Sequence, residues 1–187
     1  MMRNKDRLIE LIRKNSFKQT KTPTITLSSG KKSCYYFNLK KVTFLPEGQF
    51  LIGALMYEKI KELNLKPDGI GGLTMGADPV SFATAFTSYM HKDDICAFAI
   101  RKERKPHGMQ LQVEGNVKKG DKVIIVDDVV TTGKSTIQAI NIARENGLII
   151  LCVIVLLDRC EENGKENIEK LNVQMHSILD IHDFVII

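Results

Sequence analysis

One thirteen-residue stretch constrains the fold of this chain more than any other. It reads Val-Ile-Ile-Val-Asp-Asp-Val-Val-Thr-Thr-Gly-Lys-Ser at positions 123–135. Its first four residues are apolar and β-branched, which favours a short buried strand over a helix. After the turn, apolar residues recur at the helical spacing of Ile137, Ala139, Ile140 and Ala143. A strand-to-helix turn of this kind points backbone N–H groups and the positive end of a helix at an anion.

Two acidic residues stand between that strand and the turn. Asp127 and Asp128 would lie beside a bound phosphate, which suggests a ligand that also carries hydroxyl groups or a metal ion. A ribose phosphate has this combination of groups. Residues 133–135, Gly-Lys-Ser, look like the end of a nucleotide P-loop, but that motif requires a glycine at position 128. Helix capping accounts for one acid and leaves the other unexplained.

Composition indicates a single globular domain with an acidic small-molecule ligand. With 187 residues, of which 43% are hydrophobic, we expect one domain with a substantial core over residues 1–187. The 27 Lys and Arg against 22 Asp and Glu give a net charge of +5, which suits acidic small molecules as well as nucleic acid. The densest basic run, 101–105, has one His and no aromatic beside it, so we expect no nucleic-acid partner.

Neither the cysteines nor the hydropathy pattern indicates secretion or a membrane. The scattered Cys34, Cys96, Cys152 and Cys160 form no C-x-x-C pair, which is typical of a reducing cytoplasm and not of a disulfide framework or zinc site. The N-terminus shows no apolar signal core. The longest apolar run, 148–157, is about half as long as a membrane span. We therefore expect a cytoplasmic protein with no membrane partner.

Strand and helix patterns alternate along most of the chain. This alternation predicts an α/β fold with a doubly wound, mainly parallel sheet, whose ligands bind beyond the carboxyl ends of the strands at a switch in strand order. Residues 1–45 follow a different pattern, with a hairpin turn at Ser29-Gly30, and we expect them to form a small hood over the sheet. The predicted helices are 3–14, 46–63, 77–90, 134–146 and 161–170, and the predicted strands are 24–27, 34–37, 69–73, 95–100, 122–127, 148–157 and 173–179, with a long loop at 101–120.

Two further stretches stand at the ends of predicted strands. Residues 69–79 read Gly-Ile-Gly-Gly-Leu-Thr-Met-Gly-Ala-Asp-Pro, and glycines at a strand end allow either a tight turn or the close approach of a ligand. Residues 101–108 read Arg-Lys-Glu-Arg-Lys-Pro-His-Gly. Such a run is usually a solvated charged loop, although long loops also serve as active-site lids. The residues by themselves leave both alternatives open.

The stretch at 123–135 resembles the PRPP-binding motif of type I phosphoribosyltransferases, PRPP being 5-phosphoribosyl 1-diphosphate. The resemblance implies that Asp127 and Asp128 contact the ribose hydroxyls, that the residues after them wrap the 5′-phosphate, and that the loop at 72–76 binds the pyrophosphate. The PRPP contacts implied in these two segments are Leu73, Thr74, Asp127, Asp128, Val129, Val130, Thr131, Thr132, Gly133, Lys134 and Ser135.

Three more segments are similar to the orotate phosphoribosyltransferases of that family. The run R-K-x-x-K-x-H-G at 101–108 is characteristic of them, 26–38 resembles their signature T-L-x-S-G-x-x-S-x-Y-x-x-N, and Arg159 follows a strand where they place an arginine. The implied catalytic residues are Arg101, Lys105, His107 and Asp128, of which the first three would meet the pyrophosphate. Lys102 would also bind PRPP, in the site of the partner subunit. Orotate would be bound by Thr131, Arg159, Tyr36 and Phe37.

The resemblance implies an enzyme that converts orotate and PRPP to orotidine 5′-phosphate and diphosphate in pyrimidine biosynthesis. Mg²⁺ would arrive with PRPP and bind no protein ligand directly, and the enzyme would be a homodimer. Ser28 and Met75 stand where some members carry lysine, which leaves more of the charge to the remaining lysines. Two alternatives stay open: a phosphoribosyltransferase for another base, against which Arg159 and the 101–108 run argue, and a PRPP-sensing regulator without turnover, which the complete set of lid cations disfavours.

Overall fold

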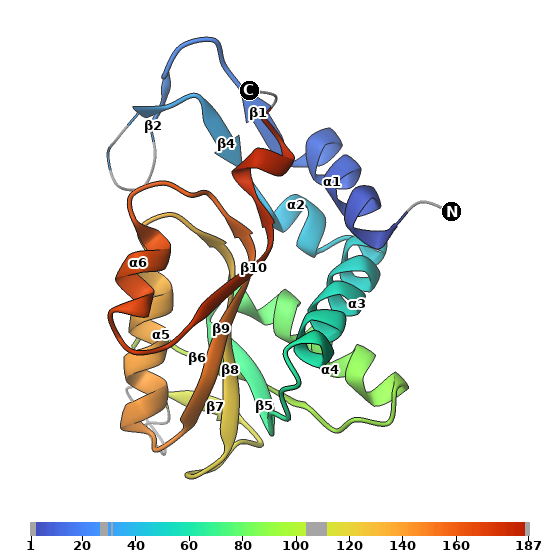
Figure 1. Ribbon diagram of the computed structural model, residues 1–187, viewed down its shortest axis with the longest axis vertical. Helices are drawn as coiled ribbons and strands as arrows, with labels where there is room; N and C mark the ends of the chain where they lie inside the picture. Colours follow the sequence, from blue (N-terminus) through green and yellow to red (C-terminus); the bar gives the residue numbers. More distant parts are fainter. Residues whose placement is uncertain (1–2, 27–29, 31, 104–111, 186–187) are drawn as a thin grey trace.

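A six-stranded sheet separates two layers of helices in the computed structural model (Figure 1), which describes residues 3–26, 30, 32–103 and 112–185. The strand order is β10-β9-β8-β5-β6-β7, and every neighbouring pair is parallel except the antiparallel β6–β7 pair. The predicted α/β fold with a mainly parallel sheet is confirmed. The strands are β5 (Gly69–Leu73), β6 (Cys96–Ile100), β7 (Val113–Gly115), β8 (Lys122–Val130), β9 (Ile149–Asp158) and β10 (Met175–Asp180).

Alternating side chains of the central strands fill two hydrophobic cores. In β8, Ile124 and Val126 pack with α1 (Asn4–Asn15), α3 (Pro46–Glu62) and α4 (Ala77–Met90). The neighbouring Val123 and Ile125 point the other way, toward α5 (Lys134–Glu145) and α6 (Gly164–Glu169). Because both faces are buried, these strands read as continuous apolar runs. None of the helices within the described ranges is long and apolar enough to cross a membrane.

The N-terminal segment forms two antiparallel strand pairs. β1 (Phe17–Gln19) pairs with β4 (Tyr35–Phe37), and β2 (Ile25–Thr26) pairs with β3 (Lys32–Ser33). The strand predicted at 34–37 is therefore present, but its partner is β1 and not the strand predicted at 24–27. Aromatic packing accounts for this pairing, since the Phe37 ring lies 4.9 Å from Phe17 and 5.2 Å from Phe184 between centroids. Ser29 of the predicted turn lies outside the described residues.

Four further elements differ from the prediction. β8 continues past both acids to Val130, because Asp127 and Val129 pair with Val155 and Leu157 of β9. The loop expected at 101–120 contains the short edge strand β7, whose three residues carry too little apolar alternation to be recognised. Two short helices, α2 (Lys40–Thr43) and the 3₁₀ turn η1 (Ile181–Asp183), follow β4 and β10.

The chain order makes β5 and β8 the switch point of the sheet, where a crevice between the outgoing loops is expected. After β5 the chain adds β6 on one side of it, then returns to place β8 on the other side. The loops that follow β5 and β8 therefore leave the sheet in opposite directions from adjacent strands, which is where open α/β sheets bind ligands. Both glycine-rich and acidic motifs stand at this crevice.

Candidate active site

The turn between β8 and α5 is built for the close approach of an anion. Gly133 adopts a left-handed backbone with φ of 78°, and a Cβ there would lie 2.9 Å from the carbonyl oxygen of Gly164. Only glycine meets both conditions without strain. α5 begins at the next residue, Lys134, so its first backbone N–H groups face the turn. A phosphate at this position would meet N–H donors and the positive end of the helix dipole.

Asp127 is an internal anchor of this turn. Its Oδ2 accepts hydrogen bonds from Ser135 Oγ at 2.7 Å and Thr136 Oγ1 at 2.9 Å, and its Oδ1 accepts from the Asp128 N–H at 3.0 Å. Burial, and then the charge of Asp128, raises the pKa of Asp127 to about 7, while these hydrogen bonds act in the opposite direction.

Asp128 is oriented differently from its neighbour. Its Oδ1 accepts from the Val129 N–H at 2.9 Å, whereas its Oδ2 lies 3.9 Å from Lys40 Nζ, an ion pair with a half-exposed lysine. Asp128 Oδ2 therefore faces Lys40 and not the backbone of the turn. Lys40 belongs to α2, which follows the N-terminal strands, and no motif in the sequence pointed to it.

The loop after β5 meets the acidic pair. A Cβ on Gly76 would lie 2.6 Å from Asp128 Oδ1 and 3.1 Å from Asp127 Oδ1, so the two loops touch. Thr74 Oγ1 donates to Asp78 Oδ2 at 2.7 Å, and Leu73 is buried within β5. The sequence allowed the glycines here to serve a ligand. Within the strand, however, the close approach of Gly72 is to the carbonyl of Val126 in β8.

The basic loop begins at Arg101, directly after β6, and its first three residues are exposed. Arg101 Nε donates to Glu114 Oε1 at 3.0 Å, and Lys102 is exposed, with its backbone carbonyl accepting from Gln138 Nε2 at 3.3 Å. Lys105 and His107 lie outside the described residues. No group of three or more His, Cys, Asp or Glu within the described part of the chain is placed to hold a metal ion.

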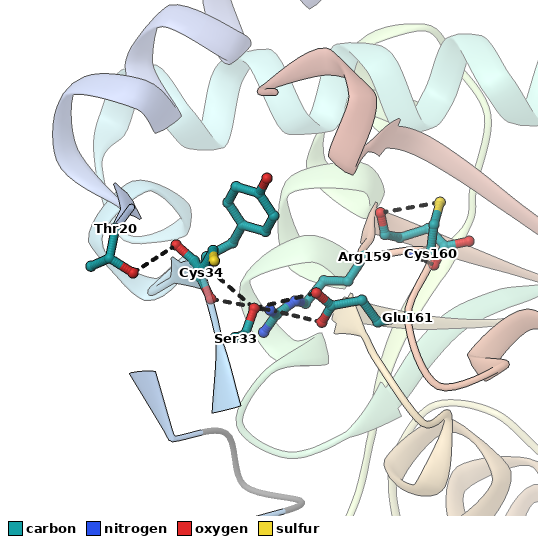
Figure 2. A network of polar contacts seen from close by, with 8 residues as sticks. Thr20, Ser33, Cys34, Arg159, Cys160 and Glu161 are labelled. Carbon is teal, nitrogen blue, oxygen red and sulfur yellow. Dashed lines mark hydrogen bonds and ion pairs between the residues drawn. The ribbon is translucent and has the colours of Figure 1, made fainter. Parts of the chain in front are cut away.

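Arg159 joins the sheet to the N-terminal strands (Figure 2). Its backbone N–H donates to the Val130 carbonyl at 3.0 Å, one strand away from the acidic pair. Its Nη2 contacts Ser33 Oγ at 3.2 Å, the Tyr35 carbonyl at 3.1 Å and Glu161 Oε2 at 2.9 Å. Burial lowers the pKa of Arg159, and the charges of Glu161 and Glu162 oppose that shift. The guanidinium is therefore a buried cation held by several internal partners.

The other residues expected at the base lie in different surroundings. Thr131 is half-buried in the turn between β8 and α5, and Tyr36 is 40% exposed. Phe37 is buried, with the Arg159 guanidinium carbon 6.0 Å from its ring centroid. Ser33 and Glu161 were not among the expected site residues, although Ser33 belongs to the signature at 26–38 and Glu161 follows the arginine by two positions.

Comparison with known proteins identifies the family. Residues 39–186 match the family model described as the phosphoribosyl transferase domain. The orotate phosphoribosyltransferase of Aquifex aeolicus is 46% identical over 185 residues, covering 99% of this chain and all of the relative. The chain belongs to the orotate phosphoribosyltransferase family. Its members are enzymes of pyrimidine biosynthesis, as the sequence motifs predicted, and neither open alternative gains support.

Solved structures of the family extend this likeness to three dimensions. The orotate phosphoribosyltransferase of Mycobacterium tuberculosis matches with a TM-score of 0.82 at 33% identity, covering 98% of this chain and 100% of that one. The same enzyme in complex with PRPP matches with a TM-score of 0.77 at 27% identity, covering 97% of this chain and 92% of that one. An orotate phosphoribosyltransferase with PRPP bound therefore shares this fold along nearly the whole chain.

Proposed function

We propose that this chain transfers the phosphoribosyl group of PRPP to orotate at the crevice between β5 and β8. The observation that carries the proposal is the meeting of the two loops, where Gly76 approaches both Asp127 and Asp128 beside the N-terminus of α5. The turn at 129–135 takes the 5′-phosphate, the acids take the ribose hydroxyls, and the loop at 73–76 takes part of the pyrophosphate. Each group meets a surface of the matching chemistry.

Bond breaking at the anomeric carbon sets what the residues must do. Orotate N1 forms a bond to the ribose carbon as the bond to the pyrophosphate oxygen breaks, through a state with oxocarbenium character. Negative charge grows on the pyrophosphate, so the cations Arg101, Lys105 and His107 gain interaction energy in the transition state. The negative charge of orotate at neutral pH is on its carboxylate, so N1 also loses its proton as the C–N bond forms, and the departing pyrophosphate, on which negative charge grows, accepts it. No strong general base from the chain is then needed, and positioning of the two substrates dominates.

Magnesium enters as part of the substrate. The acidic pair supplies two carboxylates, one of which spends both oxygens on hydrogen bonds inside the chain. Such a pair does not amount to the six-oxygen shell that Mg²⁺ prefers, and Mg²⁺ usually keeps waters and substrate phosphates as ligands. Mg²⁺ would therefore be carried by the PRPP phosphates, and Asp128, whose Oδ2 faces Lys40, would be the carboxylate that meets it through water.

Arg159 recognises the base in this proposal. Its guanidinium pairs with the orotate carboxylate, Thr131 orients the ring, and Tyr36 or Phe37 contributes apolar surface. A purine lacks that carboxylate, which is why a buried arginine favours orotate. The four unpaired cysteines agree with a cytoplasmic setting, which remains part of the proposal.

A panel assay tests the reaction itself. Purified protein with Mg²⁺ and PRPP is offered orotate, uracil, adenine and hypoxanthine, and the fall in orotate absorbance is followed. Only orotate should be consumed rapidly. The variant Asp127→Asn with Asp128→Asn should keep its fold by circular dichroism and lose turnover. Consumption of a purine in preference to orotate would overturn the assignment.

The family resemblance also assigns Lys102 to the site of a partner subunit, and an exposed apolar stripe supports a homodimer. Phe82, Phe86, Tyr89 and Met90 recur along one side of α4, each more than half exposed. At one end the stripe borders a groove of about 400 Å³ lined by Met75 of the PRPP loop. Exposed patches of this kind mark interfaces, and two-fold dimers are the commonest soluble assembly.

Subunit complementation tests the role of Lys102. An inactive Lys102→Ala protein is mixed with the inactive Asp127→Asn/Asp128→Asn protein, and the subunits are allowed to exchange. One site of each mixed dimer then contains both intact carboxylates and an intact Lys102 from the partner, while the other site lacks both. Activity should return to at most half of wild type per mixed dimer. Demonstrated exchange without recovered activity would place Lys102 outside the partner's site.

A further inference from the structure

Arg159 already has a carboxylate partner in the ligand-free chain. Glu161 Oε2 lies 2.9 Å from Arg159 Nη2, and Ser33 Oγ donates to Glu161 Oε1 at 3.3 Å. Figure 2 shows the two charged side chains turned toward each other beside Ser33. The arginine side chain is 6% exposed and that of Glu161 is 29% exposed. The buried cation is thus closed off by an acid that reaches the solvent.

The backbone after β9 makes this contact possible. Residues two apart on a strand point the same way, but residues on a turn can face each other. Cys160 adopts a left-handed φ of 52°, and Glu162 and Asn163 follow with 55° and 54°. Left-handed backbone at three non-glycine residues is costly, and such strain gathers at functional sites. The turn at 160–163 therefore folds Glu161 back onto Arg159 at an energetic cost.

The contact is loose on the arginine side. The 2.9 Å approach joins opposite charges, yet within the described residues Glu161 Oε2 has no hydrogen bond of acceptable geometry and the buried Arg159 Nε has no hydrogen-bond partner. An arginine binds a carboxylate best through two parallel N–H bonds from one edge of the guanidinium. Glu161 contacts the guanidinium through Nη2 and forms no such bidentate pair among the described residues, so a carboxylate that takes its place can gain a second N–H bond.

We infer that Glu161 is the resident counter-ion of Arg159, which the carboxylate of the base must displace, and that it thereby sets the affinity for carboxylate-bearing bases. The inference rests on the proposed pairing of Arg159 with orotate. A buried guanidinium without a partner is strongly destabilising, so the empty site needs an internal acid. Once a substrate carboxylate arrives, a second carboxylate on the same cation becomes a repulsive neighbour. Glu161 is exposed enough to move into water.

Two nucleotides isolate this effect. Orotidine 5′-phosphate and uridine 5′-phosphate share the ribose phosphate, so both use the turn between β8 and α5. Only orotidine 5′-phosphate carries a carboxylate on its base, so only this nucleotide needs Arg159. The test measures the Kd of each by calorimetry for wild type, Glu161→Gln and the control Glu166→Gln, which removes an exposed charge from the nearby α6. Glutamine keeps the size of Glu161 and removes its charge.

The displaced counter-ion predicts opposite changes in binding and stability. Glu161→Gln should bind orotidine 5′-phosphate about threefold to tenfold more tightly, the scale of one partly exposed charge pair, and uridine 5′-phosphate unchanged. Its ligand-free Tm should fall, because Arg159 loses its neutralising partner. Glu166→Gln should change neither Kd. Weaker or unchanged binding of orotidine 5′-phosphate by Glu161→Gln would overturn the inference, since a positioning residue lowers affinity when removed.

A second variant separates this inference from the proposed function. Arg159→Ala should weaken orotidine 5′-phosphate and leave uridine 5′-phosphate nearly unaffected. If Arg159→Ala leaves the ratio of the two Kd values unchanged, the base-binding role of Arg159 fails, and the inference fails with it. If Arg159→Ala behaves as expected and Glu161→Gln does not tighten binding, only the role of Glu161 fails. Should Glu161→Gln fold poorly, Glu161→Ala provides the same measurement, because it also removes the carboxylate and keeps Arg159 intact.

Discussion

At the end of the site that we assign to the phosphate, the phosphate end, the charges are two buried carboxylates. At the end that we assign to the base, the base end, they are the buried Arg159 and the partly exposed Glu161. Asp127 and Asp128 repel each other, and burial raises the pKa of Asp127 to about 7. Arg159 and Glu161 attract each other at 2.9 Å. The phosphate end therefore carries an unfavourable charge arrangement that a ligand can relieve. The base end is already neutralised, and a ligand must replace what is there.

The two ends also differ in how they are assembled from the chain. Asp127 bonds to Ser135 and Thr136, eight and nine residues further along. Arg159 bonds to Ser33 and Tyr35, which are 126 and 124 residues away. The phosphate end is a local motif that one loop completes, whereas the base end exists only after the sheet and the N-terminal strands have come together.

Gly133→Asp should have the largest effect and should act on the phosphate end alone. The substitution adds a side chain where φ is 78° and an anion where N–H groups face the phosphate, so PRPP binding should be lost. Calorimetric titration with PRPP and Mg²⁺ measures this. Gly120→Asp is the matched control, because Gly120 has a similar φ of 94° and nothing within 4 Å of its Cβ position. Unchanged PRPP affinity in a folded Gly133→Asp protein would remove this turn from the site.

This contrast explains which parts of the structure could be predicted from the sequence. The order of strand, acidic pair, turn and helix at 123–135 was predicted because these features follow one another along thirteen positions, although β8 extends three residues beyond its predicted end. The parallel sheet was predicted because buried strands and amphipathic helices alternate. Both depend on short-range patterns, which apolar spacing reports directly.

Partners far apart in the sequence were not predictable in the same way. Nothing in the spacing tells that β4 pairs with β1, that Lys40 reaches Asp128, or that Glu161 turns back onto Arg159. These contacts depend on packing of Phe37 with Phe17 and on a left-handed turn at non-glycine residues, for which the sequence has no strong signal. Arg159 itself was found only through the family resemblance.

Arg159→Ala should weaken binding of orotate in the transition state at the base end by about 2–5 kcal/mol, the cost of truncating one partner of a buried charge pair. That is roughly a 30-fold to 5,000-fold loss in kcat/KM. Uracil, which has no carboxylate, should be a poor substrate for wild type and should lose far less. Arg144→Ala, at an exposed arginine of α5, is the control and should change neither rate. Equal losses for the two bases would mean that Arg159 serves the fold.

Lys105→Ala should lower kcat by about 10²-fold, the scale of one lost transition-state contact. Lys105 lies outside the described residues, so this variant tests whether the lid serves the phosphate end as the family resemblance implies. Its Tm should stay within a degree of wild type by differential scanning fluorimetry, because the sequence predicts a loop at 101–120 and a solvated loop lysine contributes little to stability. Lys118→Ala, at an exposed lysine, should leave kcat intact. A near-normal kcat for Lys105→Ala would mean that the basic run at 101–108 is a solvated loop without a role in catalysis.

The smallest expected effect concerns the stability of the ligand-free phosphate end. The folded pKa of Asp127 is about 7, above its ordinary value of 3.8, so between these two values the folded chain holds a proton that the unfolded chain has released. Stability from this group is therefore present at low pH and is lost as the pH rises through 7. Asp127→Asn removes this titration. The Tm of the variant minus the Tm of wild type should therefore increase between pH 5 and pH 8.

Even one unit of net shift corresponds to about 1.4 kcal/mol, or roughly 3–6 °C for a chain of this length. The difference in Tm between Asp127→Asn and wild type, measured at each pH, cancels the titration of groups that do not interact with Asp127. Asp94→Asn, at an exposed carboxylate, should show no such trend. A pH-independent difference for Asp127→Asn would mean that Asp127 ionises freely in the folded chain. The phosphate end would then store no electrostatic cost, and its contrast with the neutralised base end would disappear.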